Sequence, residues 1–314
     1  MFKKIIFIII IIFSNSILKL SSVDMYFCTA ADSKYFDYLV NLIGSIHKNN
    51  FDNLKEIAVF DIGMNKGELD HLSKIQKLKI YQVNLVHPDI LKPFKTLNEG
   101  KMVPGWYAWK PVIIKQALDM FPQVLWIDSG SVVLKPLDDL FKHIKQNNYF
   151  LCTIGNATEN GRYRNPVEWQ TTQYLRKKFQ IDTPDKNWIL QQEPINASFI
   201  GVSKEALADL VLPLYEFAKD LRNFEDDGTT PGGFGTSRHD QSILALHVYT
   251  KGLRFLKQDY TQNNPMLLKV DNQEVPFYIT WDSESVSDKT HIFHSRFDLR
   301  YTTQYKQFVR YKNV

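Results

Sequence analysis

Short apolar runs alternate with amphipathic segments along the first half of the chain. Apolar residues at helical spacing predict helices, and continuous apolar runs between them predict buried strands. The predicted strands are Met25–Ala31, Glu56–Ile62, Leu78–Val83, Val124–Ile127 and Tyr149–Ile154, and the predicted helices are Tyr35–Lys48, Gly67–Lys77, Gly105–Phe121 after a short loop, and Leu137–Gln146. Strands that alternate with helices form a mainly parallel, Rossmann-like sheet flanked by helices.

The second half is less regular. Its pattern predicts helices near Trp169–Phe179, Lys204–Asn223 and His239–Tyr249, and strands at Ala197–Val202 and His291–Phe297. No repeat and no Pro- or Ser-rich linker divides the chain. We therefore expect one α/β domain with insertions over residues 23–314.

Small and polar residues gather where the predicted strands end. They are Thr29, Ala30 and Asp32 at the end of the first strand, Asp61 at the end of the second and Asp128 after the fourth. In parallel sheets, ligands bind beyond the carboxyl ends of the strands. These positions are therefore the first candidates for a binding site.

Composition narrows the class of protein. The 314 residues are 44% hydrophobic and 23% charged, a globular balance that excludes disordered and fibrous chains. The net charge of +4 depends on residues 1–22, which hold three lysines and no acid; the remainder has 35 basic and 34 acidic residues. A nearly neutral body does not favour nucleic-acid binding. Two cysteines cannot form a disulfide framework, and both lie in strand-like runs, so we expect buried thiols.

The first 22 residues resemble a targeting segment. Lys3 and Lys4 precede nine apolar residues, and Ser14 and Ser16 follow as small residues of a cleavage site. A signal anchor, associated with a membrane through residues 5–20, is the alternative, although a spanning helix needs about 20 apolar residues. Either interpretation predicts the secretory pathway or a bacterial cell envelope. Asn156-Ala-Thr and Asn196-Ala-Ser match the glycosylation pattern, but Asn196 also falls among the candidate site residues below, so we do not expect it to carry a glycan.

Asp128-Ser129-Gly130 carries the sharpest chemical signal. An acid at a strand end can hold a divalent cation through oxygen, and the cation can neutralise a diphosphate leaving group. An Asp-Ser-Gly turn that only reverses the chain is the alternative. Local chemistry does not separate the two.

The segment around Asp128, VLWIDSGSVVLKPLDDLF, resembles the strand–DxD–strand core of GT-A nucleotide-diphospho-sugar transferases, nearest to glycosyltransferase family 8. Four further sequence motifs, one before this segment and three after it, occur in the same order as in the family. Thr29-Ala-Ala-Asp32 resembles its first strand end, Asn196-Ala-Ser-Phe-Ile-Gly its Asn-Ala-Gly strand, His239-Asp-Gln its Asp-Gln helix start, and Ile292-Phe-His294 its metal-binding histidine strand.

The resemblance implies a set of roles. Asp128 and His294 would hold Mn²⁺ or Mg²⁺, and Asn196, Asp240 and Gln241 would position the donor sugar. Contacts to the nucleotide would come from Thr29, Ala30, Asp32, Asp61, Lys110 and Arg296. Ordinary turns, helix caps and solvated lysines are the alternatives at Asp32, Asp61, Lys110 and Asp240.

Two departures affect the metal. Gly130 stands where the motif has its second acid, and the family's Lys-Pro-Trp after the histidine is absent, with Arg296 nearby instead. A guanidinium can bind a diphosphate where metal coordination is incomplete.

The sequence therefore predicts a glycosyltransferase that uses a nucleotide-diphosphate sugar, UDP-linked by resemblance, and a glycan, protein or lipid acceptor. An inactive nucleotide-sugar- or glycan-binding module of the same fold is the alternative. A dinucleotide-dependent oxidoreductase is disfavoured, because no G-x-G-x-x-G follows the first strand.

Overall fold

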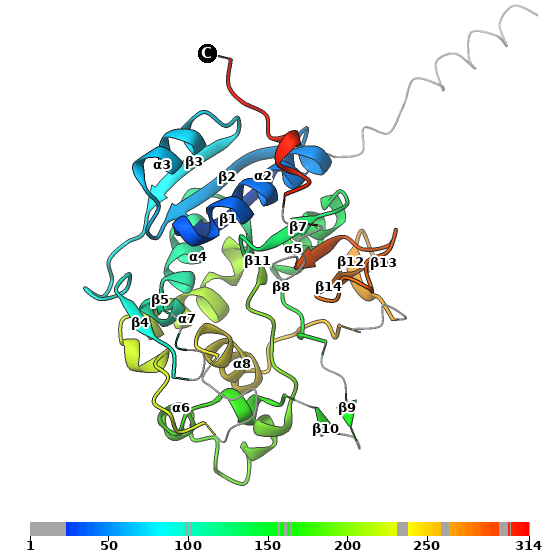
Figure 1. Ribbon diagram of the computed structural model, residues 1–314. Coiled ribbons are helices and arrows are strands. Elements are labelled where there is room, and N and C mark those ends of the chain that lie inside the picture. Colours follow the sequence, from blue (N-terminus) through cyan, green and yellow to red (C-terminus); the bar gives the residue numbers. More distant parts are fainter. Residues whose placement is uncertain are drawn as a thin grey trace, which may run out of the picture.

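A six-stranded sheet in the order β3-β2-β1-β6-β11-β8 forms the centre of the protein (Figure 1). The computed structural model describes residues 23–97, 100, 102–155, 158–159, 162–163, 165–230, 238–258, 264–294, 301 and 303–313. Neighbouring strands of the sheet are parallel except at β11, which is antiparallel to both β6 and β8. The strands are β1 (Met25–Ala31), β2 (Leu54–Asp61), β3 (Leu78–Gln82), β6 (Gln123–Ile127), β8 (Tyr149–Phe150) and β11 (Phe199–Ser203).

Helices cover both faces of this sheet. Successive strand residues alternate between two cores: Phe27 and Leu125 lie in the core that contains the apolar residues of α2 and α5, whereas Cys28 and Trp126 lie in the core of α4, α7 and α8. Burial on both faces explains why the strands read as unbroken apolar runs. The predicted single α/β domain with a mainly parallel sheet is confirmed. The helices are α2 (Phe36–Asn50), α4 (Trp109–Met120), α5 (Asp138–Asn147), α7 (Leu212–Phe217) and α8 (Asp240–Lys251).

The first half follows the predicted elements closely. Helix α3 (Lys66–Ser73) starts at a capping box in which Asn65 and Glu68 bind each other's backbone N–H groups. The predicted strand Tyr149–Ile154 is too long, because β8 ends at Phe150 and only isolated bridges follow at Cys152 and Thr153.

The second half departs from the predicted helices. The predicted helix Lys204–Asn223 is helical without a gap over Lys204–Phe217, as a 3-10 turn, a π-helix and then α7, and a separate 3-10 turn follows at Leu221–Asn223. The predicted helix Trp169–Phe179 is likewise divided, since Thr172 caps α6 by accepting a bond from Leu175 N. These pieces are η3 (Val167–Gln170), α6 (Gln173–Phe179), η4 (Asn187–Gln191), η5 (Lys204–Ala206), η6 (Leu207–Val211) and η7 (Leu221–Asn223).

Smaller sheets and turns complete the fold. The predicted strand His291–Phe297 corresponds to β15 (Ile292–His294), which pairs with β7 and β14. Residues 295–297 of the predicted strand lie outside the described part. The hairpins were not predicted. The elements are β7 (Ser131–Val133), β14 (Ile279–Thr280), β12 (Met266–Val270), β13 (Gln273–Phe277), β4 (Pro93–Lys95), β5 (Met102–Pro104), β9 (Thr158–Glu159), β10 (Arg162–Tyr163), η1 (Ser33–Tyr35), η2 (Gly105–Tyr107) and η8 (Lys306–Phe308).

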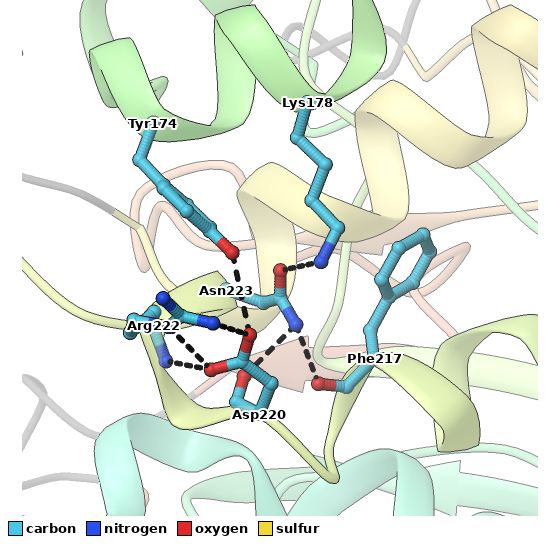
Figure 2. A network of polar contacts seen from close by, with 6 residues as sticks. All are labelled: Tyr174, Lys178, Phe217, Asp220, Arg222 and Asn223. Carbon is cyan, nitrogen blue, oxygen red and sulfur yellow. Dashed lines mark hydrogen bonds and ion pairs between the residues drawn. The ribbon is translucent and has the colours of Figure 1, made fainter.

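A polar network fastens α6 to η7 (Figure 2). Asp220 accepts two bonds from the Arg222 guanidinium, at 2.8 and 2.9 Å, and one from the Tyr174 hydroxyl at 3.3 Å. Asn223 accepts a bond from Lys178 and donates to the backbone carbonyls of Phe217 and Asp220. The bond from Arg222 is the main reason that the pKa of Asp220 falls to about 2.

The C-terminal segment 303–313 lies against α2 and α3 (Figure 1). Asn41 accepts a bond from Tyr305 N, and the imidazole Nδ1 of His47 accepts one from Arg310 N. A Cβ on Gly44 would lie 1.9 Å from the carbonyl oxygen of Tyr305, so only glycine allows this approach. The sequence did not predict this contact.

Both cysteines are buried free thiols, as expected. None of the described helices is both long and apolar enough to cross a membrane. Residues 1–22 and the sequon residue Asn156 lie outside the described part of the chain, so the targeting segment remains a prediction.

Candidate active site

The order of the strands defines where a ligand can enter. The chain passes from β1 outward to β2 and β3, and then returns to the other side of β1 with β6. In open α/β sheets, the crevice beyond the carboxyl ends of the strands at such a reversal is the usual binding position. Asp32 follows β1 and Asp128 follows β6, so both lie at this crevice.

Lys110, in the first turn of α4, joins three segments that are distant in sequence. Its Nζ lies 2.6 Å from Asp240 Oδ2 on α8, 3.2 Å from Asp128 Oδ1, and 3.1 Å from the carbonyl oxygen of Ala197 before β11. The lysine side chain is only 7% exposed. The ammonium donates a hydrogen bond to Ala197 O and forms ion pairs with the two carboxylates.

Opposing effects set the ionisation of this cluster. Burial lowers the pKa of Lys110, but Asp128 and Asp240 raise it by more, so its pKa lies above the usual value. Burial raises the pKa of Asp128, but Lys110 and then His294 lower it by more, so its pKa lies below the usual value. Two carboxylates therefore share one ammonium.

Asp128 is held by further contacts. Its Oδ1 accepts a bond of 2.9 Å from the indole Nε1 of Trp126, and its backbone N–H donates to Ser198 O at 3.0 Å. The Lys110 ammonium lies 5.3 Å from the centre of the Trp126 ring. Trp126 was not assigned to the site, although its position two residues before Asp128 on a strand puts it on the same face.

His294 ends β15 beside the Asp-Ser-Gly turn. It pairs with Ser131 across β7, and its Nδ1 lies 3.1 Å from Ser131 Oγ. The fold thus brings the two predicted metal ligands, Asp128 and His294, into one neighbourhood.

The residues in this neighbourhood do not fit a protein-held divalent cation. Oδ1 of Asp128 already accepts from Trp126 and Lys110, and Gly130 supplies no carboxylate. Gly130 does not have a positive φ, so its backbone does not require glycine. Among the described residues no group of three His, Cys, Asp or Glu side chains could hold a metal.

The residues predicted to contact the sugar do not all face the same way. Asp240 begins α8 beside Lys110, and Gln241 Nε2 donates to Gln170 Oε1 at 2.9 Å. Asn196 is 1% exposed and turned inward: its Oδ1 accepts from Ser198 N at 2.8 Å and its Nδ2 lies 3.7 Å from Cys152 Sγ. In this arrangement Asn196 shapes the loop that carries Ala197, and its contact with a sugar stays a prediction.

The residues predicted to contact the nucleotide differ in burial and in their hydrogen bonds. Thr29 is completely buried and Ala30 is 5% exposed, so their contacts with a nucleotide stay predictions. Asp32 caps η1 by accepting from Tyr35 N, and Asp61 accepts from Gly63 N and Met64 N in a turn. Arg296 lies outside the described residues.

Residues with positive φ lie just before the two helices that carry Lys110 and Asp240. Gly105, Trp106 and Tyr107 have positive φ just before α4, and His239 has φ 52° just before Asp240. The Trp106 ring stacks on His239 at 5.0 Å between centroids. Such conformations cost about 1–3 kcal/mol each in non-glycine residues and are concentrated at functional sites.

No family model matches the chain, and no curated protein matches it. Several solved glycosyltransferases have a similar structure. The galactosyltransferase LgtC in complex with donor and acceptor sugar analogs is 12% identical, over 92% of this chain and 98% of that one, with a TM-score of 0.49. Mouse xyloside xylosyltransferase 1 is 10% identical, over 88% and 99%, with a TM-score of 0.44. Core-mannan synthase A of Aspergillus fumigatus, in its Mn/GDP form, is 9% identical, over 76% and 73%, with a TM-score of 0.44.

Proposed function

We propose that the protein transfers a glycosyl group from a nucleoside-diphosphate sugar, bound at the crevice between β1 and β6, to an acceptor hydroxyl. The observation that carries this proposal is the convergence at Lys110. Asp128, Ala197 and Asp240 belong to three motifs recognised separately in the sequence, and all three contact one ammonium at the crevice.

The reaction exchanges one bond at the anomeric carbon. The acceptor oxygen forms a bond to that carbon, the bond from the carbon to the β-phosphate oxygen breaks, and the nucleoside diphosphate leaves with the electron pair. The hydroxyl proton passes to a carboxylate or to the departing diphosphate. The chain contributes mainly by positioning and by fixed charge.

Asp240 is the residue that we place against the donor sugar. Its carboxylate is held by Lys110 and its side chain keeps 12% exposure, so it is both oriented and accessible. Gln241 and Asn196 support the same region through Gln170 and the loop before β11. We assign the diphosphate to Arg296, since Lys110 is already paired with two carboxylates.

An inactive binding module of the same fold is the second candidate. Full engagement of Lys110 and the missing acid at Gly130 favour it. The two candidates differ in turnover of the donor.

Donor hydrolysis and transfer with a panel of UDP- and GDP-sugars test the proposal. We expect nucleoside diphosphate release by the wild type and its loss in Asp240→Asn. Asp119→Asn is the matched control, because Asp119 forms an exposed ion pair with Lys115 on the surface of α4. Binding of a nucleotide sugar without turnover would support the module, and no binding of any member of the panel would overturn both.

A further inference from the structure

The oxygens around Lys110 have the geometry of a cation site that the chain itself fills. Two carboxylate oxygens and one carbonyl oxygen, from Asp128, Asp240 and Ala197, lie 2.6–3.2 Å from a single nitrogen. Carboxylates and backbone carbonyls are the ligands that hard divalent cations prefer. The positive charge at their centre is covalently part of α4.

We propose that the Lys110 ammonium occupies the place of a divalent cation, so that the wild-type chain arranges Asp128 and Asp240 without binding a metal of its own. The lysine is a positioning residue, since it acts through the two carboxylates. This accounts for the absence of a second acid at Gly130: with the cation supplied by Lys110, a complete Asp-x-Asp pair is not needed to hold one.

The positive charge of Lys110 should exclude a divalent cation from the site. With Lys110 present, a divalent ion would have to approach an ammonium that already lies among the same oxygens. Without Lys110, two carboxylates would face each other at a charge of −2, which one divalent cation neutralises. Metal distances of 2.0–2.6 Å require the oxygens to move inward by up to about 1 Å.

Removing the lysine should therefore create a metal site. We expect Lys110→Ala to bind Mn²⁺ at least about tenfold more tightly than the wild type, measured by titration calorimetry with the metal alone. Mn²⁺ should also raise the unfolding temperature of this variant, because a ligand that binds only the folded state stabilises it. Lys115→Ala, which removes an exposed lysine from the same helix, should show neither effect.

A second substitution isolates the carboxylates. Lys110→Ala/Asp240→Asn keeps the space but removes one charged ligand, and it should lose the gain in affinity. Equal Mn²⁺ affinity in Lys110→Ala and wild type, or an equal gain in Lys115→Ala, would overturn the proposal.

Loss of a buried charge partner can prevent Lys110→Ala from folding, so a test on the wild type, which needs no variant, is added. The indole N–H of Trp126 donates to Asp128 and reports on any ion bound there. Its NMR signal should not broaden selectively when paramagnetic Mn²⁺ is added to the full chain. Selective loss of that signal would show metal at Asp128 despite Lys110. Both measurements use metal alone and are independent of donor turnover.

Discussion

His47 allows a quantitative test of how the C-terminal segment is held. It is completely buried on α2, and its Nδ1 accepts the backbone N–H of Arg310 at 3.0 Å. Only the neutral imidazole can accept this bond. Burial, followed by the positive charges of Arg310 and Lys77 and opposed by the backbone of Gln76, lowers the pKa of His47 from 6.5 to about 4.

The sign and size of the effect follow from proton linkage. The unfolded chain binds a proton at His47 as pH falls below 6.5, whereas the folded chain resists it until about pH 4. The contribution to stability is therefore complete above pH 6.5 and is lost as pH falls toward 4. At about 1.4 kcal/mol per pKa unit, the full contribution is roughly 3 kcal/mol.

Urea unfolding of the wild type and of His47→Asn measures this contribution. The asparagine oxygen can still accept the Arg310 N–H but does not titrate. Other histidines with lowered pKa, including His143 and His291, remain in both proteins. Between about pH 7.5 and about pH 4.5, we expect the wild type to lose roughly 2.5 kcal/mol more than the variant. Equal losses in the two proteins would refute the reasoning.

Four further outcomes are expected. Asp128→Ala should abolish transfer in a donor assay while circular dichroism shows a folded protein; wild-type turnover would place the site elsewhere. Gly130→Asp should tighten Mn²⁺ binding in a titration with nucleotide present. Arg296→Ala should weaken nucleotide binding more in the wild type than in the Gly130→Asp variant; additive effects would mean that the two positions do not act on the same charge. Asp220→Ala should lower the free energy of unfolding by about 1 kcal/mol, because it removes bonds to Arg222 and Tyr174; an unchanged urea midpoint would mean that the network contributes nothing. Residues 1–22 fused to a reporter should direct its export, and a cytosolic reporter would contradict the targeting segment.

The first half of the fold could be predicted from sequence because its strands are buried on both faces. Unbroken apolar runs and short polar turns mark such strands directly, as at β1 and β6. The antiparallel direction of β11 depends on pairing between distant segments, which no local pattern records.

The charged residues of the candidate site could be picked out from the sequence, whereas the directions of the polar side chains could not. Lys110, Asp128 and Asp240 stand at a helix start and a strand end, and the structure brings them together. Asn196 lies in a recognised motif, but a motif gives position and not the direction of a side chain. Thr29 illustrates the same limit, since it lies within a strand covered on both faces.

The contact between α2 and the C-terminal segment has a consequence for biosynthesis. Asn41, Gly44 and His47 emerge from the ribosome some 260 residues before Tyr305 and Arg310, the partners that complete their packing. A contact of such long range carries a high entropic cost before it forms and slows folding. Helix α2 is synthesised early but is among the last elements to complete its packing. Until then its unpaired face is exposed to chaperones and to translocation machinery.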